Sequence, residues 1–152
     1  MTAPSAQPGA APVGRLSDLA PLERRIVRSL RLLGHGEVGR MAFRMDLAAG
    51  LGADAAEAVG GRLEELLVTL LRHARRPVAC HDIACPCVGG DEYALARFVA
   101  LAAEGDREDA VLLAAMLVRS DIVLCLAPLA EEVGLRVGRI PLAVVPPATG
   151  IH

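Results

Sequence analysis

Residues 54–77 of the chain read DAAEAVGGRLEELLVTLLRHARRP, and this stretch predicts the clearest helix of the sequence. Apolar side chains recur within it every three or four residues, at Val59, Leu63, Leu66, Leu67, Leu70 and Leu71. That spacing places them on one face of an α-helix. Asp54, with Glu57 three residues later, predicts the start of the helix, and Pro77 marks its end. Because an apolar helix face must be buried, we expect further helices packed around this one.

Two glycines, Gly60 and Gly61, interrupt the apolar face of this helix. Each costs about 1 kcal/mol of helix stability relative to alanine. A neighbouring helix that approaches closely would explain their presence. We therefore expect a tight contact between helices at this point.

Helical spacing of apolar residues continues on both sides of this stretch. The one run that resembles a strand is residues 142–145, and prolines bracket it. Five further helices are predicted, over residues 19–33, 37–49, 91–104 and 107–119 and from residue 121 onward. Residues 110–118 are apolar on all sides, which predicts a central position, and Cys125 falls on an apolar face, which predicts a core position. The predicted fold is all-α, a compact bundle of five or six helices with a Cys/His loop between helices three and four.

With 152 residues and a mass of 15.9 kDa, the chain has the size of a single domain. We expect a disordered tail over residues 1–16, a helical domain over residues 17–139 with a Cys/His-rich loop at 73–90, and a flexible tail over residues 140–152. The first residues lack the pattern of a secretory signal, and no apolar run approaches the length of about 20 residues that a membrane span needs. These features predict a cytoplasmic protein that does not contact membranes.

Charge is divided unevenly along the chain, and all its basic side chains apart from histidine are arginines. Residues 1–76 carry eleven arginines and eight acids, whereas residues 77–152 carry five arginines and ten acids. We expect the two halves to attract each other within one fold. The net charge of −2 and the aromatic content of 2% count against nucleic acid as a partner.

The stretch HARRPVACHDIACPC, residues 73–87, concentrates three of the four cysteines and two of the four histidines. Thiolates and imidazoles in groups of four form tetrahedral zinc sites. The candidate metal ligands are His73, Cys80, His81, Cys85 and Cys87. Their C-x4-C and C-x-C spacing differs from the C-x2-C pairs of a zinc knuckle. A site closed by four protein ligands has no open position for a substrate, so this interpretation is structural.

At this loop the chain resembles small uncharacterised bacterial proteins in which a helix ends in a Cys-containing turn, a Cys-rich stretch follows and an Asp-Glu pair opens a helix. Residues 70–92 carry the resemblance, with weaker similarity as far as residue 135. His73 and Cys85 stand where such relatives place cysteines, whereas Arg76 and Gly89 stand where further cysteines would be expected. The resemblance implies metal binding, with the loop and the following helix acting as one unit. It implies no known activity.

Three functions fit these residues. In the first, zinc stabilises the loop, and the protein acts as an adaptor or regulatory module whose helical face binds a protein partner or a second copy of the chain. In the second, the Cys-Pro-Cys motif of Cys85 and Cys87 performs thiol redox chemistry or handles a soft metal. In the third, the cysteines stay reduced and the protein is a metal-free structural interaction protein.

Catalytic motifs find less support in the sequence. His81 near Cys85 also fits a Cys–His nucleophile pair, but no phosphate-binding loop, nucleophile elbow or small-molecule substrate site accompanies it. An iron–sulfur cluster normally takes four cysteines, and Cys125 is far from the other three in sequence. We therefore expect a protein without enzymatic activity, with zinc as its cofactor.

Overall fold

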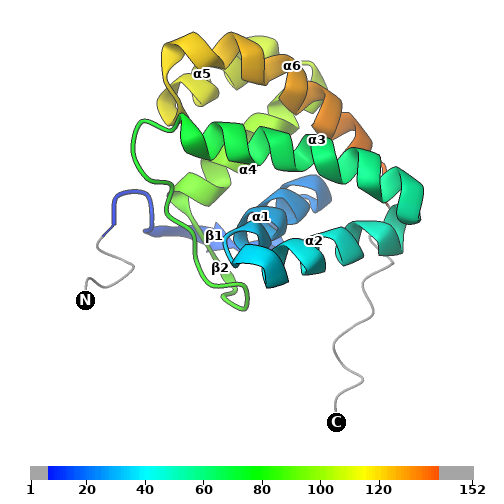
Figure 1. Ribbon diagram of the computed structural model, residues 1–152. Coiled ribbons are helices and arrows are strands. Elements are labelled where there is room, and N and C mark those ends of the chain that lie inside the picture. Colours follow the sequence, from blue (N-terminus) through cyan, green and yellow to red (C-terminus); the bar gives the residue numbers. More distant parts are fainter. Residues whose placement is uncertain (1–6, 141–152) are drawn as a thin grey trace.

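The computed structural model describes residues 7–140, which form six helices and a small two-stranded sheet (Figure 1). The helices are α1 (Pro21–Leu33), α2 (Gly36–Leu51), α3 (Ala53–Arg72), α4 (Gly90–Glu104), α5 (Arg107–Leu117) and α6 (Ser120–Val137). Strands β1 (Pro12–Arg15) and β2 (Cys87–Gly89) pair antiparallel, and a 3₁₀ turn, η2 (Leu16–Asp18), follows β1. The predicted helical bundle is confirmed.

Helix α4 is the central element of the bundle and packs against α1, α5 and α6 (Figure 1). Its side chains Leu95 and Phe98 are fully buried. The prediction that residues 110–118 form the central helix is wrong, because α5 lies at the edge, with Leu112 65% and Met116 74% exposed. An apolar surface on every side of a helix does not determine how many neighbours that helix has.

Helix α3 packs against α2 and α6 through the apolar face that its sequence predicts. The buried side chains on this face are Val59, Leu63, Leu66, Leu67 and Leu70, whereas Leu71 is exposed. The helix starts at Ala53, one residue before the predicted cap Asp54. Gly52 precedes it with a φ of 84°, a left-handed conformation that glycine adopts without strain.

Of the two glycines at which a close helix contact was predicted, Gly60 lies at one, against α2, and Gly61 does not. A Cβ on Gly60 would stand 3.2 Å from the Leu47 side chain, and one on Gly61 would meet nothing within 4 Å. On α6, by contrast, a Cβ on Gly134 would lie 2.8 Å from the Ala103 Cβ of α4. Helices α4 and α6 therefore approach each other closely at a glycine near the end of α6.

Gly61→Ala is expected to stabilise the protein by about 0.5–1 kcal/mol. The added methyl group has open space, and alanine loses less backbone entropy than glycine in a helix. Denaturant unfolding monitored by circular dichroism measures the change. A loss of stability in this variant would mean that α3 is more crowded at residue 61 than the structure indicates.

The N-terminal part of the described chain is not a free tail. We expected disorder over residues 1–16, and the structure instead places Pro12–Arg15 in strand β1, paired with β2. The reason is tertiary, since the partner strand follows more than seventy residues later. Residues 1–6, and residues 141–152 of the expected C-terminal tail, lie outside the described residues, and Ile140 is buried.

Three further expectations concern Cys125, membrane spans and the charge of the two halves of the chain. Cys125 is exposed on α6 and does not belong to the core, because the buried side of this helix contains Val123, Leu126 and Ala130. None of the helices within residues 7–140 has the length and apolar character needed to cross a membrane. The predicted attraction between the two halves of the chain is confirmed by ion pairs such as that of Arg62 with Glu132, at 2.9 Å.

Candidate functional site

Residues 73–86, the cysteine loop, join α3 to β2 and lie against the end of α1 and the start of α4 (Figure 1). Its backbone reverses direction in a turn, where the Cys85 N–H donates to the Asp82 carbonyl at 3.0 Å. The turn returns Cys85 towards His81, which precedes it by four residues. Because little regular structure supports the loop, its order depends on the side chains that it surrounds.

A buried ion pair between Arg31 of α1 and Glu92 of α4 lies beneath the loop. The guanidinium donates to the carboxylate through Nε at 2.7 Å and through Nη2 at 2.9 Å, and the two side chains are 2% and 0% exposed. Glu92 also accepts the backbone N–H groups of His81 and Gly89, at 3.2 and 3.0 Å. This carboxylate therefore caps its own helix and holds the loop at two points.

Arg31 uses its remaining donors on the loop backbone. It donates to the carbonyls of Asp82 at 3.0 Å, Cys85 at 2.8 Å and Cys87 at 2.6 Å. A planar guanidinium presents five N–H donors in a fixed arrangement, which a flexible lysine cannot reproduce. Hydrogen bonds from this one arginine therefore fix the backbone conformation of the segment from Asp82 to Cys87.

A second ion pair anchors the entry to the loop. Arg76 donates to both carboxylate oxygens of Asp91, at 2.8 and 2.9 Å. Asp91 also accepts the backbone N–H of Ala79 at 2.9 Å. The two acids that open α4 therefore bind different parts of the same loop, Asp91 its beginning and Glu92 its middle and end.

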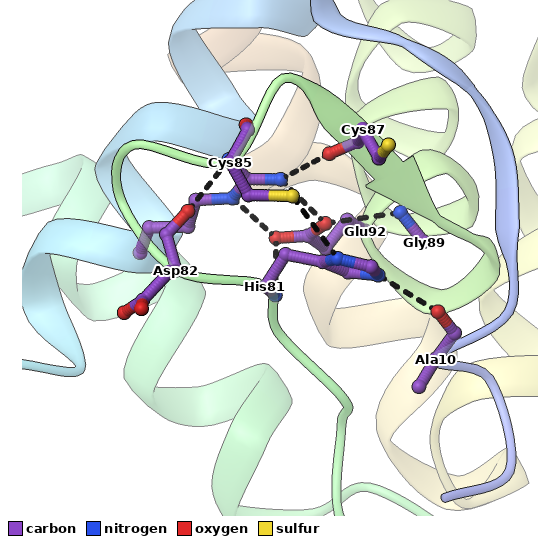
Figure 2. Close-up of polar contacts among 8 residues, drawn as sticks. Ala10, His81, Asp82, Cys85, Cys87, Gly89 and Glu92 are labelled. Carbon is purple, nitrogen blue, oxygen red and sulfur yellow. Dashed lines mark hydrogen bonds and ion pairs between the residues drawn. The ribbon is translucent and has the colours of Figure 1, made fainter. Parts of the chain in front are cut away.

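His81 and Cys85 form the chemically distinctive contact of the loop (Figure 2). The Cys85 Sγ lies 3.5 Å from the His81 Nδ1, and the His81 Nε2 lies 2.7 Å from the carbonyl oxygen of Ala10. A carbonyl oxygen only accepts hydrogen bonds, so we assign the hydrogen on Nε2 of the ring. The neutral ring then presents the Nδ1 lone pair to the sulfur and can accept the proton of the thiol.

The surroundings favour the charged forms of this pair. The Cys87 backbone N–H and then His81 hydrogen-bond to Cys85 and lower the pKa of its thiol. Burial alone would lower the pKa of His81, but its hydrogen bonds to Ala10 and Cys85 raise it. Desolvation of the thiol and the charge of Glu92 raise the pKa of Cys80 to about 11, although the residue as a whole is exposed, so this neighbouring thiol stays protonated at neutral pH.

An open cleft of about 750 Å³ gives access to the pair. Its walls are formed by Leu30, Arg31, Gly34, His35, Cys80, His81, Asp82, Ala84 and Cys85. One side is the turn between α1 and α2, and the other is the cysteine loop. A reagent of modest size can therefore reach Cys85 from solvent.

The structure unites some of the five predicted ligand residues and separates others. His81 and Cys85 are in contact, Cys80 lines the same cleft, and Cys87 begins β2. His73 ends α3, where its carbonyl accepts the N–H of Arg119 at 3.2 Å. Within residues 7–140 no group of three or more His, Cys, Asp or Glu side chains is arranged to hold a metal ion. Zinc binding therefore stays a prediction.

Sequence reasoning missed the residues that shape this site. The five candidate residues drawn from the sequence include neither Arg31 nor Glu92. One available indication was spacing, since Arg31 follows the buried Val27 by one helical turn. Ala10 gave no indication at all, because its role lies in a backbone carbonyl that any residue possesses.

Comparison with known proteins yields no family model, curated protein or solved structure that matches this chain.

Proposed function

We propose that this protein performs thiol–disulfide chemistry, with Cys85 as the reactive thiol, His81 as its base and Cys87 as the second thiol. The observation that carries the proposal is the contact of Cys85 Sγ with His81 Nδ1 at the wall of an open cleft. A nucleophile beside a base, with the base oriented by a third group, is the usual arrangement of an activated cysteine. Here the third group is the Ala10 carbonyl.

The reaction takes a small disulfide as its oxidant. His81 Nδ1 accepts the proton of Cys85, and the resulting thiolate attacks one sulfur of the disulfide. A mixed disulfide forms, and the other half leaves as a thiolate that takes the proton from His81. Cys87 then attacks the Cys85 sulfur with loss of its own proton, which forms a Cys85–Cys87 disulfide and releases the second thiol. Two cysteines are oxidised and one disulfide is reduced.

The geometry favours this chemistry over a structural zinc site. A closed zinc site needs four donors around one point, and within residues 7–140 no group of three or more His, Cys, Asp or Glu side chains is arranged to hold a metal ion. All four cysteines are unpaired in this structure, so the thiols are available. A reducing compartment keeps such thiols ready for reaction, and we place the protein in the cytoplasm for this reason.

At pH 7, iodoacetamide is expected to alkylate Cys85 at least about tenfold faster than Cys80. Each unit of pKa changes the fraction of thiolate tenfold, and the lower nucleophilicity of the less basic Cys85 thiolate offsets only part of this difference. As pH falls from 9 to 7, the rate at Cys80 should drop about tenfold per unit, since its pKa is about 11. The rate at Cys85 should fall less, because its pKa is lowered. Peptide mass spectrometry over a time course measures both.

Cys125→Ser serves as the matched control, since this exposed thiol lies on α6, away from the loop. Incubation with 2-hydroxyethyl disulfide should convert the wild type to a form that has lost two hydrogens, whereas Cys87→Ser should stop at the mixed disulfide on Cys85. Equal alkylation of Cys80 and Cys85 would contradict the proposal. So would one equivalent of zinc in the purified protein that blocks both thiols, and that result would favour the structural metal site.

A further inference from the structure

The segment from Gln7 to Leu16, which we name the N-terminal strap, is fixed along the edge of the cysteine loop. Its Leu16 N–H donates to the Pro86 carbonyl at 2.8 Å, and β1 within it pairs with β2. The strap also accepts hydrogen bonds, at its Ala11 carbonyl from Gly90 N–H and at its Gly9 carbonyl from Asp91 N–H. These bonds tie the strap to the start of α4.

Within this strap the Ala10 carbonyl is aimed at the His81 ring (Figure 2). Ala10 is only 4% exposed, so this carbonyl meets His81 in a place that water does not occupy freely. The 2.7 Å contact with Nε2 fixes both the ring orientation and the tautomer that turns Nδ1 towards Cys85. A histidine without this acceptor can rotate about its side-chain bonds or place its hydrogen on Nδ1.

The strap acts on the ring from behind and does not cover the thiol. None of its described residues belongs to the walls of the cleft that exposes Cys85. Its one charged residue, Arg15, stands in register with Cys87 on the neighbouring strand. Detaching the strap from Ala10 onward would therefore change hydrogen bonding at His81 without opening or closing the cleft.

We propose that the N-terminal strap is a positioning element for the thiol site, so that Cys85 is fully reactive only while the Ala10 carbonyl holds His81. This inference rests on the proposed function and adds the group that orients the base. The remaining charged and titratable groups around the pair come from other elements: Arg31 of α1, His35 of the α1–α2 turn, Cys80, Asp82 and Cys87 of the loop and β2, and Asp91 and Glu92 of α4. Two of them also contact the strap, Asp91 beside Gly9 and Cys87 in register with Arg15, and the others belong to elements outside it.

Two glycines of the strap provide a matched pair of variants. Gly9 has a φ of 84°, and a Cβ there would overlap the Asp91 carboxylate, which Arg76 and the Ala79 N–H hold in place, so Gly9→Ala strains the docking of the strap on α4. Gly14 has no atom within 4 Å of its Cβ position, so Gly14→Ala leaves the strap docked. Ala10→Gln also displaces the strap, but at a different residue, because a larger uncharged side chain does not fit a buried alanine position.

In the full-length protein, Gly9→Ala and Ala10→Gln are expected to slow alkylation of Cys85 at pH 7 by about tenfold, because a misoriented base no longer activates its thiol. Gly14→Ala should match the wild type. The ¹⁵N chemical shifts of His81 should change in the first two variants towards a mixture of tautomers, a readout that a purely structural role of the strap would not move. The rate at Cys125 and the melting temperature report whether each variant is folded.

The outcomes separate this inference from the proposed function. If Cys85 keeps its wild-type rate and His81 its tautomer in folded Gly9→Ala and Ala10→Gln proteins, the strap has no positioning role, while the thiol site stands. If wild-type Cys85 reacts no faster than Cys80, the proposed function itself fails, whatever the strap does. A variant that fails to fold is replaced by the other, since the two disturb the strap through different contacts.

Discussion

Arg31→Leu is expected to lower the free energy of unfolding by about 3–5 kcal/mol, because it leaves the fully buried Glu92 carboxylate without its counter-ion. The same change removes the donors to three loop carbonyls, at Asp82, Cys85 and Cys87. Urea unfolding followed by circular dichroism measures the loss. Arg31→Lys should recover only part of it, since one ammonium group cannot reproduce the arrangement of a guanidinium.

Arg28→Leu is the matched control for this effect. Arg28 lies one helical turn earlier on α1 and pairs with Asp46, but both side chains are largely exposed. Exposed ion pairs contribute about 0–1 kcal/mol, so this variant should change stability little. If Arg31→Leu cost no more than Arg28→Leu, the Arg31–Glu92 pair would not be the support of the loop that its geometry indicates.

Gly39→Ala is expected to destabilise the protein by about 1–3 kcal/mol or more, as overpacking against rigid atoms does. A Cβ on Gly39 would overlap the Leu32 carbonyl oxygen, and a backbone atom cannot move aside as a flexible side chain can. Accommodation requires α2 to shift away from the end of α1. Because that junction forms one wall of the cleft, the access of reagents to Cys85 should change as well.

Gly61→Ala again provides the comparison for Gly39→Ala, because both replace a helical glycine and only one meets a backbone atom. Thermal and denaturant unfolding of the two variants should shift in opposite directions. Equal effects would show that helix propensity decides both sites and that the close approach of α1 to Gly39 is relieved at little cost.

Local patterns sufficed for much of the fold. The helix bounds near Gly105 and Asp106 follow from residues close in sequence: Gly105 ends α4 in a left-handed conformation, and the Asp106 side chain accepts the N–H of Asp109. The apolar face of α3 was predictable for the same reason. The central place of α4 was not, because the neighbours of a helix are determined by how the whole bundle assembles.

The candidate site was predictable in its residues but not in its geometry. The clustering of His81, Cys85 and Cys87 pointed to this loop, yet the pattern alone favoured four metal ligands over one thiol–imidazole contact. Arg31 and Glu92 are 61 residues apart, and the local sequence of neither residue identifies the other as its partner. The role of Ala10 depends on a backbone carbonyl, which carries no information in the amino-acid sequence.

The adjacency of Asp91 and Glu92 at the start of α4 has a mechanical consequence. Successive residues of one rigid helix hold the strap, the beginning of the loop and the backbone on either side of the Cys85 turn. Any sliding or tilting of α4 must displace all of them together. The order of the His81–Cys85 contact therefore depends on the position of α4 within the bundle.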